Sequence, residues 1–463
     1  MEKNNIYFYK GKENIFEKEN KDSFKKIQEA FLKVLDNKNL SFLLGSGCSS
    51  YEKLKEGESY SDESQEDIQS EESNEVGSSS NEDMKSKQKE TISKDDDEKQ
   101  IGIPVMVPMA NKFYESNDFS EDKEWLKTEL DIDVESDKHD FKKNLESFLS
   151  TLHSLSFYYS KIHIESDKKE ENNKTKKADR INEIIVKTRN FILKKCLNEE
   201  NIREEKDREL VDIYKTFYKK LLTRNPTLPR LNIFTTNYDL YSERAMDSLG
   251  IHYVNGFTGG VSKYFNPTIF NYALAEKMDL SQSKWSVIDN FFYLYKIHGS
   301  VNWIEADSKE KLFKVKEIQD PTFDKLKEEQ TIMIHPTPLK YNASLGSPYS
   351  DLFREFQKKL MQNNNILVTI GYSFSDEHIN NLIFQAFTIP SFRLIVIGEP
   401  KDWNAIGKLK ELDDPRIWII GGTDDKEIPL HYFKRFVEET LPDLTNEDLY
   451  EKMEKTLKEL PRC

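Results

Sequence analysis

The stretch LNIFTTNYD (residues 231–239) joins a hydrophobic run to a cluster of polar side chains. Its first half predicts a short buried strand, and residues 241–249 follow with the apolar spacing of a helix. The polar cluster between them consists of Thr235, Thr236, Asn237 and Asp239. Because ligands bind at the carboxyl ends of the strands in an open parallel sheet, this stretch predicts one wall of a binding site.

Three further stretches have the same form, a hydrophobic run that stops at small or polar residues: FLLGSGCSS (42–50), FYLYKIHGSVNW (292–303) and ILVTIGYSFSDEHIN (366–380). Strands are predicted at 40–44, 231–236, 292–297, 331–335, 366–370, 393–398 and 417–420. Helices are predicted at 24–35, 241–249, 350–362, 376–387, 404–412, 427–440 and 445–460. This alternation predicts an α/β fold with a doubly wound, mostly parallel, Rossmann-like sheet.

The chain between the first two predicted strands differs from the rest. Residues 51–100 are dominated by Glu, Ser, Asp and Lys and predict a disordered acidic insertion. Residues 101–230 predict an inserted helical subdomain, interrupted by a charged linker at 166–180. We therefore expect a first segment (1–50) with a helix, a strand and a glycine turn, then these two insertions. The rest of the sheet domain (231–440) and a helical tail (441–463) complete the chain.

Composition limits the possible functions of this 463-residue chain. Its formal net charge of −15 argues against a general nucleic-acid or anionic-membrane binder. The three cysteines lie far apart with no CxxC pair, which excludes a four-cysteine zinc site and a disulfide framework. No signal-peptide core and no apolar run of about 18 residues occurs, so we expect a cytoplasmic protein that does not span a membrane.

The glycine turn and the polar cluster each allow two interpretations. Gly45, Ser46, Gly47 and Ser49 follow a strand, where small residues let backbone amides approach a pyrophosphate. A plain tight turn is the alternative, since the third glycine of the usual dinucleotide fingerprint is missing. Asn237 and Asp239 are caps of the next helix in one interpretation. In the other, Asn237 orients a sugar hydroxyl or a water and Asp239 binds an amide or a ribose.

The later motifs add one candidate for proton transfer and several contacts. His298 ends an apolar strand, and Gly299 after it leaves room for a substrate; a structural histidine is the alternative. Ser375 and Asp376 are candidate caps of the following helix, whereas Ser373 is expected to face a ligand. Gly371 and Glu399 end two further strands, and Glu399 borders a candidate adenine-ribose pocket.

In their order along the chain, the glycine turn, TTNYD (235–239), KIHGS (296–300) and GYSFSD (371–376) resemble the SIR2-like family. The similarity is to sirtuins and, more closely, to bacterial SIR2-like NAD-cleaving proteins of anti-phage defence. The resemblance implies that NAD+ is the substrate. We expect no metal, because the chain cannot build a four-cysteine zinc site. The residues that the resemblance identifies as cofactor-binding are Gly45, Ser46, Gly47, Ser49, Asp239 and Ser373. We expect the same role for Thr236, Gly371 and Glu399, which follow the ends of their strands. The resemblance identifies His298 and Asn237 as catalytic.

Two departures from the sirtuin pattern affect the expected activity. The chain lacks the zinc-ribbon cysteines of sirtuin deacylases, which favours NAD hydrolysis over protein deacylation or ADP-ribosyl transfer. The glycine turn carries Ser46 in place of the usual alanine, and the acidic insertion follows it. A module that binds NAD or ADP-ribose without cleaving it is a further alternative. By resemblance, we expect a homo-oligomer or control by a partner such as a HerA-like hexameric ATPase.

Overall fold

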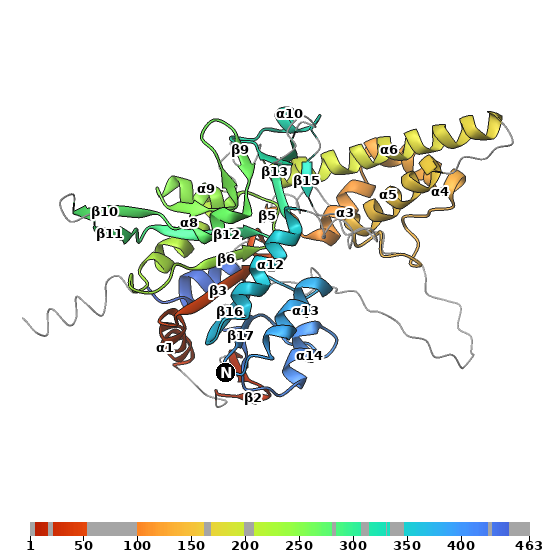
Figure 1. The fold of residues 1–463 in the computed structure, drawn as a ribbon. Helices are drawn as coiled ribbons and strands as arrows, with labels where there is room; N and C mark the ends of the chain where they lie inside the picture. The colour runs from red at the N-terminus through yellow and green to blue at the C-terminus, as the bar shows by residue number, and fades with distance from the viewer. Residues whose placement is uncertain are drawn as a thin grey trace, which may run out of the picture.

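A computed structural model describes residues 5–16, 22–52, 100–161, 168–198, 208–279, 284–306, 314–329, 331–333, 347–424 and 428–443. A nine-stranded sheet lies at its centre (Figure 1). In spatial order its strands are β2 (Glu13–Asn14), β1 (Tyr7–Lys10), β18 (Ile417–Gly421), β17 (Arg393–Ile397), β16 (Asn365–Ile370), β3 (Asn39–Leu44), β6 (Asn232–Thr235), β12 (Phe291–Lys296) and β7 (His252–Val254). From β18 to β7 all neighbours are parallel, which confirms the predicted fold class.

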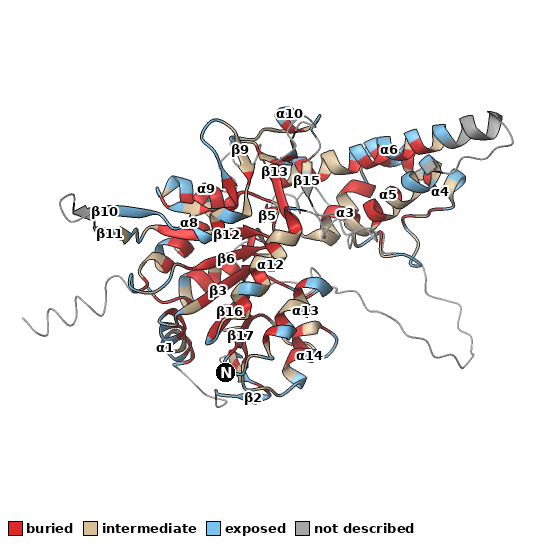
Figure 2. Ribbon diagram, viewed as in Figure 1, coloured by how far each residue is buried: buried red, intermediate tan, exposed pale blue. Residues whose placement is uncertain are grey.

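The central strands are buried on both faces, as their continuous apolar runs predict. Phe42 of β3 packs on one face with side chains of α1 (Ser23–Leu35) and α8 (Arg208–Leu222). Leu43 packs on the other face with α12 (Tyr349–Leu360) and α13 (Glu377–Ala386). Helices α9 (Tyr241–Ser248) and α14 (Ala405–Glu411) extend these two layers. Figure 2 shows the sheet as the buried centre between them.

The strand order places a topological switch at β3. The chain passes from β3 through inserted helices to β6 on one side, and later returns to β16 on the other side. Connections therefore leave the carboxyl ends of β3 and β16 in opposite directions along the sheet. Such a point is where open α/β sheets bind their ligands.

The insertion after β3 contains α3 (Met106–Tyr114), α4 (Ser120–Leu130), α5 (Leu145–Lys161) and α6 (Lys168–Leu197), preceded by the hairpin of β4 (Ser50–Glu52) and β5 (Gln100–Gly102). The prediction of a linker at 166–180 was wrong, because α6 begins at Lys168 and continues through it. Lys, Glu and Ala are good helix formers, so a charged run of this kind can continue a helix. Arg180 and Lys187 of α6 both bind the buried carboxylate of Asp122 in α4.

A second, antiparallel sheet was not predicted. Its strands are β15 (Thr331–Met333), β13 (Gly299–Glu305), β14 (Val315–Glu317), β9 (Lys263–Phe265) and β8 (Phe257–Thr258). The strand expected at 331–335 belongs to this sheet, not to the parallel one, because β15 pairs with β13. Gly299 has φ +87°, which turns the chain out of the main sheet directly after β12. A separate hairpin, β10 (Ala275–Asp279) and β11 (Lys284–Val287), projects from the body (Figure 1).

The two ends of the chain differ from the prediction in smaller ways. Before α1 the chain forms the edge strands β1 and β2, which were not predicted. The helix expected at 427–440 begins only at Phe433, as α15 (Phe433–Arg435) and a π-helical turn (Phe436–Thr440), because Pro429 forms a bridge with Thr423. Most of the acidic insertion and the helix predicted at 445–460 lie outside the described residues. No helix in the described ranges is long and apolar enough to cross a bilayer.

Gly45, directly after β3, generates a stability prediction. A Cβ at this position meets the carbonyl oxygen of Gly371 at 2.2 Å and the Cα of Tyr372 at 2.6 Å, both of which are backbone atoms. We expect Gly45→Ala to lower the free energy of unfolding by about 3 kcal/mol, because neither neighbour can rotate away. Urea denaturation measures the change, with Gly260→Ala as the control, since nothing lies within 4 Å of its Cβ. Equal stability of the two variants contradicts the prediction.

Candidate functional site

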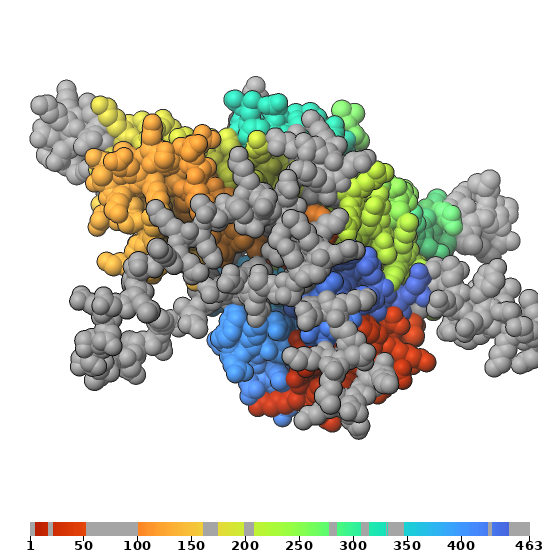
Figure 3. All heavy atoms as spheres, turned by 180° about the vertical axis from the view of Figure 1, so that it is seen from behind, coloured from red at the N-terminus to blue at the C-terminus, as the bar shows by residue number. Residues whose placement is uncertain are grey.

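A cavity of about 380 Å³ opens at the carboxyl ends of the central strands. The loops after β3, β6, β12, β16 and β17 form its floor, and the inserted helices form one wall. Figure 3 shows those helices, in orange and yellow, on one side of the molecule. Nearly all predicted site residues line the cavity: Ser46, Gly47, Ser49, Thr236, Asn237, Asp239, His298, Gly371, Ser373 and Glu399. Gly45 is not among the lining residues.

The glycine turn is held by the turn after β16. The backbone amide of Gly45 donates to Ile370 O at 2.9 Å, and that of Gly47 donates to Gly371 O at 3.0 Å. Ser46–Cys48 then form a single 3₁₀ turn. Burial raises the pKa of the Cys48 thiol, and the carboxylate of Asp239 raises it further. Cys48 is therefore a protonated packing residue rather than a nucleophile.

The hydroxyl of Ser49 connects the glycine turn to the TTNYD loop. It donates to Asp239 Oδ2 at 2.6 Å and accepts from Asn237 Nδ2 at 2.8 Å. Its oxygen also lies 3.3 Å from the Tyr214 hydroxyl of α8. All four side chains are buried, so this network holds the loops after β3 and β6 in one arrangement.

Asn237 and Asp239 differ in how far they act as caps. Asp239 Oδ1 accepts from the amide of Tyr241, the first residue of α9, so its carboxylate supports both the helix and Ser49. Asn237 does not cap the helix. Its Nδ2 donates to Gly45 O at 2.9 Å and to Ser49, which uses both N–H bonds of the amide. Only the carbonyl oxygen of Asn237 then remains to meet a ligand.

His298 lies between β12 and β13, beside the turn after β16. Its Nε2 lies 2.9 Å from Asp376 Oδ2, and both side chains are largely buried. The two atoms are close enough for a hydrogen bond, but their approach does not have the angle of a well-formed one. Asp376 Oδ1 accepts from the amides of His378 and Ile379, which confirms the predicted cap of α13.

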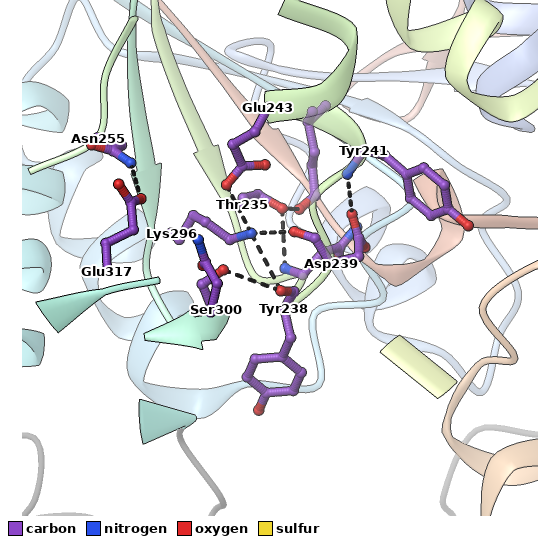
Figure 4. Close-up of polar contacts among 12 residues, drawn as sticks. Thr235, Tyr238, Asp239, Tyr241, Glu243, Asn255, Lys296, Ser300 and Glu317 are labelled. Atoms are coloured by element: carbon purple, nitrogen blue, oxygen red, sulfur yellow. Dashed lines mark hydrogen bonds and ion pairs between the residues drawn. The ribbon is translucent and has the colours of Figure 1, made fainter. Parts of the chain in front are cut away.

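A buried lysine contacts the backbone of the TTNYD loop (Figure 4). Lys296, the last residue of β12, is 1% exposed and lies 3.1 Å from Glu243 Oε1 of α9. Its ammonium also donates to the backbone oxygens of Tyr238 and Asp239. Burial raises the pKa of Glu243, and the charge of Lys296 offsets part of that rise. Lys296 thus fixes the backbone that carries the neighbouring Asn237.

One hydrogen bond ties the inserted helices to the same loop. The hydroxyl of Tyr238 donates to Glu146 Oε1 of α5 at 2.9 Å. Burial, followed by the charge of Glu146, raises the pKa of Tyr238, so the hydroxyl keeps its proton. Asn144 caps α5 by accepting from the amides of Glu146 and Ser147. Both Asn144 and Glu146 line the cavity.

Two further predicted contacts, Ser373 and Glu399, also line the cavity. Ser373 is exposed and its hydroxyl donates to Ser375 at 3.1 Å. Glu399, after β17, lies 3.4 Å from the Lys401 ammonium. Within the described ranges no group of three or more His, Cys, Asp or Glu side chains is placed to hold a metal ion.

Several lining residues were missed by the sequence analysis. The apolar wall from the insertion is one group: Ile103, Val105, Met106, Met109, Ile192 and Cys196. His431, from the chain just before α15, is another. Lys296 and Glu243 do not line the cavity and were also missed, although a lysine inside the apolar run FYLYKI indicates a buried partner. The residues of the apolar wall carried no such signal, because their sequence pattern is that of ordinary core residues.

The sheet and its cavity at the switch point define a Rossmann-like α/β protein. A family model described as a SIR2-like domain matches residues 231–402, so the chain carries a SIR2-like domain there. SIR2-like domains bind NAD, and an NAD-related activity is implied. β3 lies outside the matched range but pairs with β6 and β16 inside it. A search of curated proteins gives no match.

The buried ion pair generates a pH-dependent prediction. Lys296→Met leaves the Glu243 carboxylate without its cation, and we expect a loss of about 3 kcal/mol in unfolding free energy near neutral pH. The change raises the folded-state pKa of Glu243 further above its ordinary 4.5. The unfolded state then ionises first, so the loss grows as pH rises above that value.

Urea denaturation at about pH 5 and about pH 8 tests this prediction, with the larger loss expected at pH 8. Arg354→Met is the control, because its pair with Asp351 is exposed on the arginine side. A loss that is the same at both pH values contradicts the role assigned to the pair.

The contact between α5 and the TTNYD loop is tested by a double-mutant cycle. Tyr238→Phe removes the donor and Glu146→Gln removes the charge, and we expect a coupling energy of about 1 kcal/mol between them. Unfolding free energies of the two single variants and the double variant give the value. Tyr272→Phe, on an exposed tyrosine, is expected to show no coupling with Glu146→Gln. Additive losses for Tyr238→Phe and Glu146→Gln disprove the coupling.

Proposed function

We propose that the protein is an NAD+ glycohydrolase that releases nicotinamide and ADP-ribose. The observation that supports this best is that His298 and Asn237, far apart in sequence, line one cavity. That cavity lies at the switch point of a doubly wound sheet, where dinucleotides bind. Its volume of about 380 Å³ is within the range of small-molecule sites.

The reaction does not require a strong general acid from the protein. Cleavage of the nicotinamide–ribose bond passes through an oxocarbenium-like state, and nicotinamide leaves as a neutral molecule. The bond electrons go to the nicotinamide nitrogen, and a water oxygen bonds to the ribose carbon. His298 accepts the proton released by that water or by a ribose hydroxyl and passes it to solvent. The apolar wall around Met106 and Ile192 shields the reacting centre from bulk water.

Asn237 has a narrower role than the sequence alone suggested. Because its amide nitrogen is committed to Gly45 and Ser49, its Oδ1 is the atom that accepts a hydrogen bond from the water or the sugar. An acceptor aimed at a water orients a lone pair of that water toward the ribose carbon. The backbone that carries Asn237 is held by Lys296, which limits movement during the reaction.

We further propose that the activity serves bacterial anti-phage defence by depleting NAD. The support for this role is the resemblance of the four motifs to such proteins. Because loss of NAD kills a cell, the enzyme needs an inactive state and a trigger. We propose control by a HerA-like hexameric ATPase, another defence partner or homo-oligomerisation. The hydrogen bond between Tyr238 and Glu146 is one route by which the inserted helices act on the catalytic loop.

A second candidate is a module that binds NAD or ADP-ribose without cleaving it. One observation favours it: both N–H bonds of Asn237 are used to hold the glycine turn, as a purely structural asparagine would use them. Calorimetric titration of the wild-type chain with NAD, alongside a nicotinamide assay, separates the two. Tight binding without nicotinamide release, with and without the product of the neighbouring gene, supports the module.

The hydrolase is tested with single variants. We expect His298→Ala and Asn237→Ala to reduce nicotinamide release by about 10²-fold or more, because each loses a proton-transfer or water-positioning group. Release is measured on purified protein incubated with NAD, alone and with the neighbouring gene product. His252→Ala is the control, since His252 is exposed on the edge strand β7. Release by His298→Ala at the wild-type rate rules out the proposed role of the imidazole.

A further inference from the structure

The carboxylate of Asp376 makes two kinds of contact, and its role as the cap of α13 explains only one of them. One oxygen, Oδ1, accepts from two amides at the start of α13, at 2.9 Å and 3.2 Å. The other, Oδ2, lies 2.9 Å from Nε2 of His298, which comes from the loop between β12 and β13. A residue that only caps a helix needs one oxygen and no imidazole beside the other.

The loop that carries Asp376 is held in an unfavourable backbone conformation. Phe374 has φ +60°, a region that bulky side chains rarely adopt, although its side chain is buried. Asn380, one turn into α13, holds the loop from both ends. Its Nδ2 donates to Phe374 O at 2.7 Å, and its Oδ1 accepts from the Tyr372 hydroxyl at 3.0 Å. Strain of this kind persists where the surrounding structure fixes it, and it is concentrated at functional sites.

The position of the carboxylate decides which nitrogen of the imidazole meets the substrate. A carboxylate beside Nε2 favours the tautomer in which Nε2 carries the proton. Nδ1 is then the unprotonated nitrogen. When Nδ1 accepts a proton, the imidazolium lies beside the negative charge of Asp376, which stabilises it.

We propose that Asp376 is a positioning residue that acts through His298: it selects the Nε2–H tautomer, so that Nδ1 is the base in NAD cleavage. This inference rests on the proposed hydrolase function. Asp376 itself gains and loses no proton in the reaction. The proton from the water or the ribose hydroxyl goes to Nδ1 of His298 and then to solvent, while the proton on Nε2 stays in place.

Two substitutions separate the charge of Asp376 from its capping role. Asp376→Asn keeps a good N-cap for α13 but removes the charge beside His298. Asp376→Ala removes both, so its Tm should fall below that of Asp376→Asn. We expect both variants to lose kcat by about 10²-fold, with KM changed by less than about threefold, because the substrate contacts remain. A wild-type kcat for Asp376→Asn overturns the proposal.

The tautomer is measured independently of activity. Long-range ¹H–¹⁵N correlation on the full chain with ¹⁵N-labelled histidine shows which ring nitrogen carries the proton, and the His298→Ala spectrum identifies the signal of His298. We expect Nε2–H in the wild type and a shift toward Nδ1–H in Asp376→Asn. A proton on Nδ1 in the wild type overturns the proposal. If the wild type cleaves no NAD under any condition, the proposed hydrolase function is wrong. The tautomer measurement then still shows whether Asp376 sets which ring nitrogen of His298 carries the proton.

Discussion

The close approach of two backbone turns, at Gly45 and Gly371, is the constraint on which the site depends. Each turn ends a central strand, and each lacks a Cβ at the point where the other passes. Two amide-to-carbonyl hydrogen bonds then join the turns. Side chains of ordinary size at these positions would separate β3 from β16 at the edge of the sheet where the cavity opens. The cavity therefore exists because the two strands end at residues without side chains.

Buried polar groups also fix the loop next to the two glycine turns. Ser49 joins the glycine turn to Asn237 and Asp239, and the Lys296 ammonium donates to the backbone oxygens of Tyr238 and Asp239 in the same loop. Each group in this network is costly to bury without its partner, so the loops adopt one arrangement rather than several. A site held in this way meets its substrate with little reorganisation, which is the condition for positioning a water accurately.

The inserted helices have a place in the site that their sequence does not reveal. Helices α3 and α6 supply most of the apolar side chains that line one wall of the cavity. Through Glu146 of α5, the inserted helices also contact the TTNYD loop. The insertion therefore forms one wall of the cavity and also contacts the loop that carries Asn237.

The amino-acid sequence by itself determined the parallel sheet and the candidate residues. Continuous apolar runs that end at Gly, Asn, His or Asp are local patterns, and the ends of parallel strands meet at one edge. It did not determine the antiparallel sheet around β13, since short strands with distant partners carry no local signal. Nor did it decide that Asn237 holds the glycine turn while Asp376 faces His298. Those roles depend on which atoms of distant segments come within hydrogen-bonding distance, and only the tertiary structure sets that distance.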